Sequence, residues 1–272
     1  MKSLAAVNIR QFERAVESLE QYKTVVDMGW TVLLRDNQPM PLKTGGKAAV
    51  CMIIGSDQGM CGQFNEVLWP FAQEHVRTLE DQGLDMTYWS MGDKITGTLQ
   101  DAGLLESEHL SMPGSLNAIN AWVQDVIQRI EIWRSTKQME HVYVCHNMVS
   151  DQGGYSQVFQ KVLPLDKAWA EAYVSQKWPN RCLPMMGLQK EAMFKHLFSQ
   201  YLFVSFYRAF AQSMASENAA RLMAMQAAEK NILELEEELQ ALFREQRQAG
   251  ITSELLDIIS GFEALSEEDV LI

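Results

Sequence analysis

The sequence predicts an α/β fold: a Rossmann-like α/β domain with a mostly parallel sheet, plus a long antiparallel two-helix coiled coil from the N- and C-termini. Both ends of the chain carry apolar residues at heptad spacing, and residues 188–249 contain neither glycine nor proline. Between them, short apolar runs alternate with helix-like stretches. We therefore expect an N-terminal coiled-coil helix over 1–35, an α/β globular domain over 36–187 and a long C-terminal coiled-coil helix over 188–272.

The N-terminal segment is predicted to be a helix with one apolar seam. Lys23 is the one polar residue where the series expects an apolar one. The other seam positions alternate spacings of four and three, as a heptad repeat requires: Ala5, Ile9, Phe12, Val16, Leu19 and Val26. A turn-rich run over 36–46, with two prolines and a Gly-Gly pair, is expected to end this helix.

The middle of the chain changes period. Ala48 to Ile54 is a continuous apolar run between glycines, which predicts a strand buried on both faces. Further strands are predicted at Thr87–Met91 and Val142–Met148, with a weaker one near Leu104. Helices are expected between these strands, over roughly 64–81, 93–102 and 116–133, and a loop-rich stretch over 150–184.

The C-terminal helix is predicted to be longer than a globular domain needs. At about 1.5 Å per residue, a continuous helix through 188–249 would approach ~90 Å. Its seam runs through Ile232, Leu235, Leu239, Leu242 and Ala249, with Gln246 as an exception. It restarts in a new phase, a stutter that locally alters a supercoil, at Ile251, Leu255, Ile258, Phe262 and Leu265.

Two terminal heptad helices separated by one compact domain must run antiparallel if they pair. The alternative is that both helices pack on the sheet, which the first few turns could do. Heptad steps back from Ile232 place Asn218 and Arg221 on the seam. A polar residue there fixes the register or meets a partner, or it points outward through helix curvature; the sequence leaves both open.

Composition limits the classes of function. The formal net charge of -12 disfavours a nucleic-acid or anionic-membrane surface. The four cysteines form no CxxC pair and no HExxH motif is present, so the sequence does not support a zinc site. A reducing, intracellular compartment fits this use of cysteine best. The N-terminus lacks a signal-peptide pattern, and the most apolar helical region, 193–210, is interrupted by charged residues and predicts no membrane span.

One glycine-rich loop follows the first predicted strand. Its glycines fall at 55, 59 and 62, which fits neither the dinucleotide fingerprint nor a Walker loop, so a tight turn that lets backbone segments approach closely is favoured. Cys61, at the predicted helix start, is a reactive thiol or, by default, a packed side chain. Ser56 and Asp57 lack a GxSxG elbow. We therefore predict no catalytic, cofactor-binding or metal-binding residues.

Three stretches resemble the gamma subunit of F-type ATP synthases: SDQGMCGQFN, SMASENAARLMAMQAAEKN and RQAGITSELLDIISG. The last two together are specific to that family, and the order of the chain agrees over nearly its whole length. The resemblance implies a non-catalytic central-stalk rotor without cofactors. Its terminal helices would enter a hexamer of alpha and beta subunits, and its α/β domain would sit on the epsilon subunit and the membrane ring of c subunits.

The resemblance also implies positions of contact. By motif, Arg247, Gln248, Thr252 and Glu254 would contact the inner collar of the hexamer, and Met1, Lys2 and Arg221 would lie at the level of the beta-subunit lever. The subunit would be peripheral to the membrane, on the cytoplasmic face of a bacterial or archaeal inner membrane, with no span of its own. It would serve proton or sodium transport coupled to ATP synthesis or hydrolysis.

Two departures from the family pattern are visible. Phe262 follows Gly261 where the signature continues Gly-Ala, which favours a variant branch such as the alternative, sodium-type ATPases. MKSLAAVNIR matches a point about six turns inside the family's N-terminal helix. We therefore expect the sequence to start at an internal methionine, and the stripe Ile232, Leu235, Leu239 and Leu242 to be exposed.

A rival from another class is a soluble Rossmann-like enzyme whose long helices mediate oligomerisation. Such an enzyme requires a pocket in which polar or titratable groups converge. A third reading, a coiled-coil adaptor unrelated to ATPases, leaves the combined C-terminal motifs unexplained.

Overall fold

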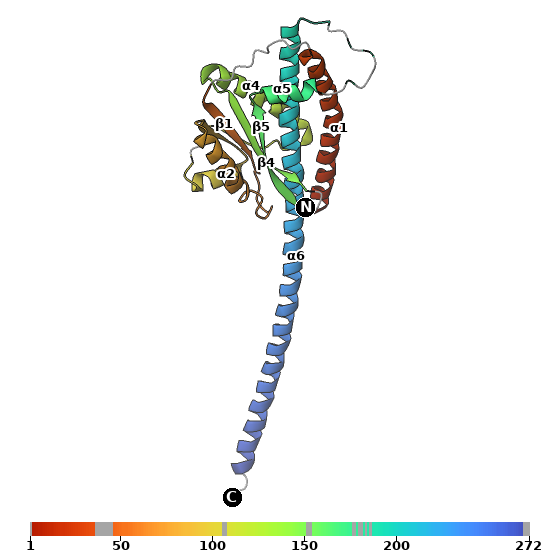
Figure 1. Ribbon diagram of the computed structural model, residues 1–272. Helices are drawn as coiled ribbons and strands as arrows, with labels where there is room; N and C mark the ends of the chain where they lie inside the picture. The colour runs from red at the N-terminus through yellow and green to blue at the C-terminus, as the bar shows by residue number, and fades with distance from the viewer. Residues whose placement is uncertain are drawn as a thin grey trace. The chain divides into compact units, whose positions relative to one another are not determined.

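The computed structural model describes residues 2–35, 46–104, 108–150, 154–175, 178, 182, 184 and 187–268 (Figure 1). The predicted turn-rich run lies outside these residues except for Gly46. The chain divides into two compact units, Met1–Ala224 and Met225–Ile272. The first unit holds the sheet and its covering helices. The second consists of the C-terminal part of one long helix, α6 (Lys190–Glu268).

Within the described residues, the sheet of the first unit has five strands in the order β3-β2-β1-β4-β5. Strands β1 to β4 are parallel neighbours, and only β5 runs antiparallel, to β4. The expected mostly parallel sheet is therefore confirmed. The bounds of the strands are β1 Ala48–Ile54, β2 Asp85–Met91, β3 Glu108–Leu110, β4 His141–Val149 and β5 Tyr155–Leu163.

The sequence predictions for β3, β5 and α5 of this unit were wrong in detail. Strand β5 and the short helix α5 (Lys167–Val174) fall in the stretch expected to be loops. β5 is an edge strand whose side chains are mostly half-buried, so its sequence carries no clear alternation. The weak strand expected near Leu104 is β3, a few residues later.

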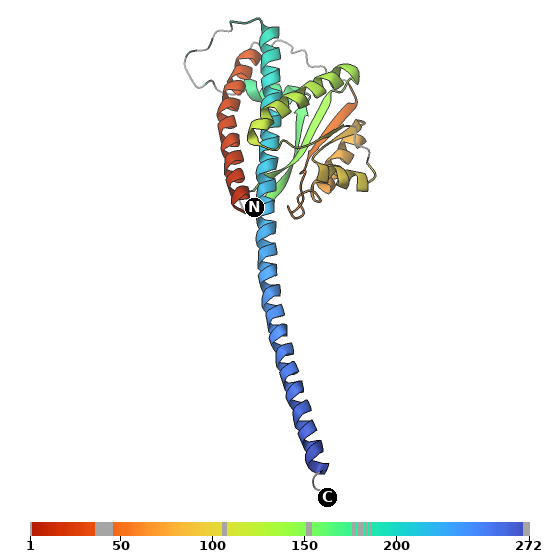
Figure 2. The same cartoon turned by 180° about the vertical axis from the view of Figure 1, so that it is seen from behind.

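Helices cover both faces of the sheet. Helices α2 (Leu68–Asp81) and α3 (Asp93–Asp101) pack on the face formed by Cys51, Ile53 and Cys145. The opposite face, which includes Val50 and Met52, packs in one apolar core with α4 (Leu116–Thr136), α1 (Lys2–Leu34) and the first part of α6. Figures 1 and 2 show α2 and α4 on opposite sides of the sheet. The result is a Rossmann-like, doubly covered sheet.

Helix α1 runs antiparallel to the first part of α6, as expected. As the residue numbers of α1 increase, those of the contacting residues of α6 decrease. Nδ2 of Asn8 donates to Oδ1 of Asn218 (3.5 Å), and Glu20 forms an ion pair with Arg208 (3.0 Å). Further along α1, the ring of Trp30 lies 5.6 Å from that of Phe194. The two helices lie side by side in both Figures 1 and 2. The seam of α1 is largely buried, with Ala5, Phe12, Leu19 and Val26 all below a tenth exposed.

The first part of α6 also packs on the sheet. Oγ of Ser213 donates to the carbonyl of Ile54 (3.3 Å), and Oγ of Ser216 donates to that of Asn147 (3.0 Å). These turns of α6 therefore both pair with α1 and pack on the sheet, so the two arrangements considered from the sequence occur together here. Because α6 has α1 on one side and strands on the other, residues 202–218 are mostly buried.

Candidate partner-binding sites

The loop after β1 is a hydrogen-bonded turn. Oδ1 of Asn65 accepts from the backbone N–H of Ser56 (3.0 Å), and Nδ2 of Asn65 donates to the Ser56 hydroxyl (2.9 Å). A Cβ added at Gly55 would lie 2.5 Å from Cβ of Ile95, so the close approach expected of this loop is confirmed there. Gly62 has open space around it but a φ of 60°, which favours glycine for a different reason.

Helix α2 begins at Leu68, not at Phe64 as predicted, because residues 61–67 form turns. Cys61 therefore lies seven residues before the helix and has no helix dipole to stabilise a thiolate. It is 2% exposed, and its Sγ lies 3.7 Å from the hydroxyl of Ser56. Burial is the largest effect on its thiol and raises its pKa, which supports the packed-side-chain reading.

Asp57 connects this loop to two others. Its carboxylate accepts hydrogen bonds from the backbone N–H of Met112 (3.0 Å at Oδ2) and of Asp93 (3.2 Å at Oδ1). One side chain thereby fixes the segments that follow β1, β2 and β3. Sequence reasoning missed this role, because nothing in the local motif shows that the donors come from residues so distant in the chain.

A cavity of about 260 Å³ lies beside Asp57, and we call it the polar cavity. Its walls come from the first half of α1, residues 57–58, residues 112–116 and the part of α6 before the unit boundary. Arg221 and Glu217 of α6 line it and form an ion pair with an N–O distance of 2.5 Å. The side chain of Arg221 is only 16% exposed, so the outward-pointing reading of this residue was wrong.

The neighbouring seam residue, Asn218, is also turned inward. It is 6% exposed, lines the polar cavity and is hydrogen-bonded to Asn8 of α1. Asn218 thus links α6 to α1 at a defined position along both helices, as expected of a polar seam residue that fixes the register of the pair.

Glu217 is an ionisable residue that lines the polar cavity and is buried there. Burial raises the pKa of its carboxyl group; the cation of Arg221 opposes that shift, and the negative charge of Asp57 adds to it. The i, i+4 spacing of Glu217 and Arg221 was a signal in the sequence that could have predicted their pairing.

The other predicted contact residues lie elsewhere. Arg247, Gln248, Thr252 and Glu254 are exposed on α6 in the second unit, where the Thr252 hydroxyl donates to the carbonyl of Gln248 (2.8 Å). Helical geometry places Gln248 and Thr252 on one face, and Arg247 and Glu254 on another. Lys2 opens α1, but its side chain lies outside the described residues, as does the whole of Met1.

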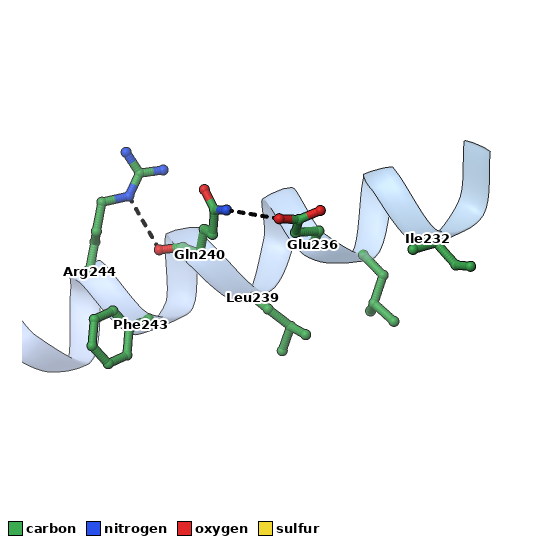
Figure 3. Close-up of a pocket in the computed structure, with 7 residues that line it drawn as sticks. Ile232, Glu236, Leu239, Gln240, Phe243 and Arg244 are labelled. Atoms are coloured by element: carbon green, nitrogen blue, oxygen red, sulfur yellow. Dashed lines mark hydrogen bonds between the residues drawn. The ribbon is translucent and has the colours of Figure 1, made fainter. Parts of the chain in front are cut away.

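The second unit also exposes apolar side chains, as expected. The stripe Ile232, Leu235, Leu239 and Leu242 is more than half exposed at every position. Figure 3 shows Ile232, Leu239 and Phe243 on one side of the helix, and Glu236, Gln240 and Arg244 on the other. Ile251, Leu255 and Ile258 are similarly exposed, while the side chains of Phe262 and Leu265 lie outside the described residues. Contiguous apolar surface of this kind marks a surface for a partner.

Within the described part of the chain, no helix combines the length and the apolar character that a bilayer crossing demands. The same residues contain no group of three or more His, Cys, Asp or Glu arranged to hold a metal ion.

Comparisons with known proteins agree on one family. Residues 1–265 match the family model described as ATP synthase. A relative from Histophilus somni (strain 2336), named ATP synthase gamma chain, is 25% identical over 272 residues, covering 97% of this chain and 92% of its own. The ATP synthase gamma chain of Glaesserella parasuis serovar 5 is 28% identical over 215 residues, which is 79% of this chain and 73% of its own.

Solved structures show the same fold. A chain from the central stalk and c-ring of the Tetrahymena thermophila mitochondrial ATP synthase aligns with a TM-score of 0.58 at 20% identity, covering 84% of this chain and 97% of that one. A chain from the rotor of the Euglena gracilis mitochondrial ATP synthase aligns with a TM-score of 0.53 at 16% identity, covering 92% and 98%.

Proposed function

The chain belongs to the ATP synthase gamma family, and on this premise we propose that it is the central-stalk rotor subunit of an F-type ATP synthase or ATPase. It couples ion flow through a membrane ring to ATP synthesis or hydrolysis in an alpha/beta hexamer. The observation that carries the proposal is the match of the family over residues 1–265, which includes both terminal helices. The antiparallel pairing of α1 with α6 gives a stiff element of the kind that a shaft requires.

The partners of such a rotor are the alpha and beta subunits, the epsilon subunit and the c-subunit ring. The rotor performs no bond chemistry. A helical shaft whose faces differ presents a different surface to each beta subunit as it turns, so each beta subunit is biased toward a different affinity for nucleotide. Rotation and ATP turnover are then linked by differential contacts.

The exposed residues of the second unit supply such contacts. Arg247, Gln248, Thr252 and Glu254 meet the inner collar of the hexamer, and their exposure supports this role. Arg221, with Met1 and Lys2, meets the lever of a beta subunit. Because Arg221 is paired with Glu217 inside the polar cavity, a partner reaches it through the mouth of that cavity.

The subunit acts at the membrane surface as a peripheral component of the complex, on the cytoplasmic face of a bacterial or archaeal inner membrane. Residues 1–35 and 188–272 form the shaft and 36–187 the domain that sits on the epsilon subunit and the ring. The use of sodium as the coupling ion stays a prediction from Phe262.

The experiment that tests the proposal is co-expression of the tagged chain with alpha, beta and epsilon subunits. We expect one copy of the chain to co-purify with each hexamer, and deletion of the residues after Ala249 to abolish ATP-driven ion pumping in reconstituted vesicles. A chain that purifies alone and converts a metabolite unaided would instead establish the rival reading, a soluble Rossmann-like enzyme with oligomerising helices.

A further inference from the structure

We propose that the polar cavity is a socket for one basic side chain, a lysine or an arginine, of a partner subunit. Nothing in the family match assigns a ligand to this cavity. The inference deepens the proposed function, because the identity of the partner rests on that function, whereas the chemistry of the socket rests on the residues of this chain alone.

The size of the polar cavity suits a single side chain. Its volume, about 260 Å³, is below the range of roughly 300–1,000 Å³ that is usual for small-molecule and cofactor sites. Gln58, Gly114 and Ser115 form an exposed rim, whereas Glu217 and Asn218 are buried. A side chain that enters past the rim therefore reaches a carboxylate and an amide.

The cavity is lined by both kinds of surface that a basic side chain requires. Phe12, Met214 and Leu116 provide apolar contact for a stem of methylene groups. Asp57 and Glu217 provide carboxylates for a charged head. A lysine or an arginine combines a long apolar stem with a cationic tip, so it has a contact for each kind of surface in this lining.

The formal charges of the lining leave one negative charge in excess. Asp57 and Glu217 are acidic and Arg221 is the one basic residue among those that line the cavity in the described chain. The ion pair of Arg221 uses Oε1 of Glu217, and the carboxylate of Asp57 is held in place by two backbone N–H groups. An entering cation completes the charge balance, and an entering anion worsens it.

The environment of Glu217 supports the same conclusion. The pKa of its carboxyl group is raised, first by burial and also by the charge of Asp57, even with Arg221 in contact. The contact with Arg221 therefore does not fully offset the cost of burying the Glu217 carboxylate. A second cation supplied by a partner favours the ionised form of Glu217 and is attracted in return.

The chemistry is tested on the full-length chain alone. Isotope-labelled protein is titrated with butylammonium and butylguanidinium chloride, and with sodium butyrate as the matched anion, while the backbone amide signals are followed by NMR. We expect saturable shifts at Asp57, Gly114 and Glu217 with the cations. Equal shifts with butyrate, or cation effects that rise linearly like those of added sodium chloride, would overturn the proposal.

Two variants separate the socket from general effects on the fold. Glu217→Gln removes the excess charge, and Ser115→Trp blocks the rim while every charge is kept. Ser115 makes no side-chain capping hydrogen bond to α4, so its replacement removes no cap. Both variants are expected to lose the saturable shifts. Glu236→Gln, which changes an exposed glutamate in the second unit, is the matched control and is expected to keep them.

In the assembled complex, Ser115→Trp is expected to weaken association of the chain with its partner subunits at least about tenfold, as loss of a charged hydrogen bond does. Normal co-purification of the chain without cation binding overturns the socket but leaves the rotor assignment standing. Saturable cation binding without co-purification supports the socket and overturns the assignment to an ATP synthase.

Discussion

His146 gives the stability of the first unit a dependence on pH whose size can be worked from the structure. This histidine of β4 is 1% exposed, and its Nε2 donates to Oε1 of Gln212 on α6 (3.1 Å). Its Nδ1 is buried without a hydrogen-bond partner. Burial lowers the pKa of the imidazole from 6.5 to about 4, because a charged ring would be desolvated there.

The sign follows from proton linkage. Between pH 6.5 and pH 4 the unfolded chain binds a proton at this histidine and the folded chain does not, so the stability falls as the pH is lowered through that window. A difference of about 2.5 pKa units predicts a loss of about 2 kcal/mol between pH 7 and pH 5, at about 1.4 kcal/mol per unit.

The assay is urea unfolding of the first unit at pH 7, 6 and 5. Other groups also titrate, so the quantity compared is the pH dependence of the wild type against that of His146→Gln. The variant is expected to have a lower stability at pH 7 but to lose about 2 kcal/mol less on acidification. His196→Gln, at an exposed position of α6, is expected to keep the wild-type slope. Equal slopes in the wild type and His146→Gln would refute the reasoning.

Two further substitutions test the packing. Gly55→Ala places a Cβ 2.5 Å from Cβ of Ile95, so it is expected to lower the stability by about 1–3 kcal/mol and the melting temperature with it. Gly59→Ala is the control, because the nearest atom to its added Cβ lies 3.7 Å away and no clash results. Equal melting temperatures would contradict the close approach. Phe12→Ala leaves a cavity in the α1 seam and is expected to lower the free energy of unfolding, measured in urea, by about 3–5 kcal/mol. Val7→Ala changes an exposed residue of the same helix and is expected to have a small effect. Similar losses of stability in the two variants would show that the seam is not packed.

The sequence predicted the parts of the fold whose side chains repeat with one period. The seam of α1 was visible because its buried residues recur every three or four positions, and β1 because a strand buried on both faces is apolar throughout. Strand β5 was missed because an edge strand with half-buried side chains mixes polar and apolar residues without order. The start of α2 was misplaced because the turns before it contain buried residues such as Phe64.

The sequence predicted only part of the candidate partner-binding sites. Arg221 was identified as an unusual seam residue, and its pairing with Glu217 follows from their spacing. The polar cavity could not be predicted, because its walls come from four segments that only the folded sheet brings together. Asp57 is the clearest case: its carboxylate accepts from backbone groups 36 and 55 positions away.

The central claim is that this chain turns inside a hexamer of partner subunits. The most direct measurement immobilises the alpha/beta hexamer, attaches a visible probe to the exposed Cys182 of the chain and records the probe after addition of ATP. The account predicts sustained rotation in one direction that stops when ATP is exhausted. A probe that stays fixed, on complexes that hydrolyse ATP at the normal rate, would contradict it.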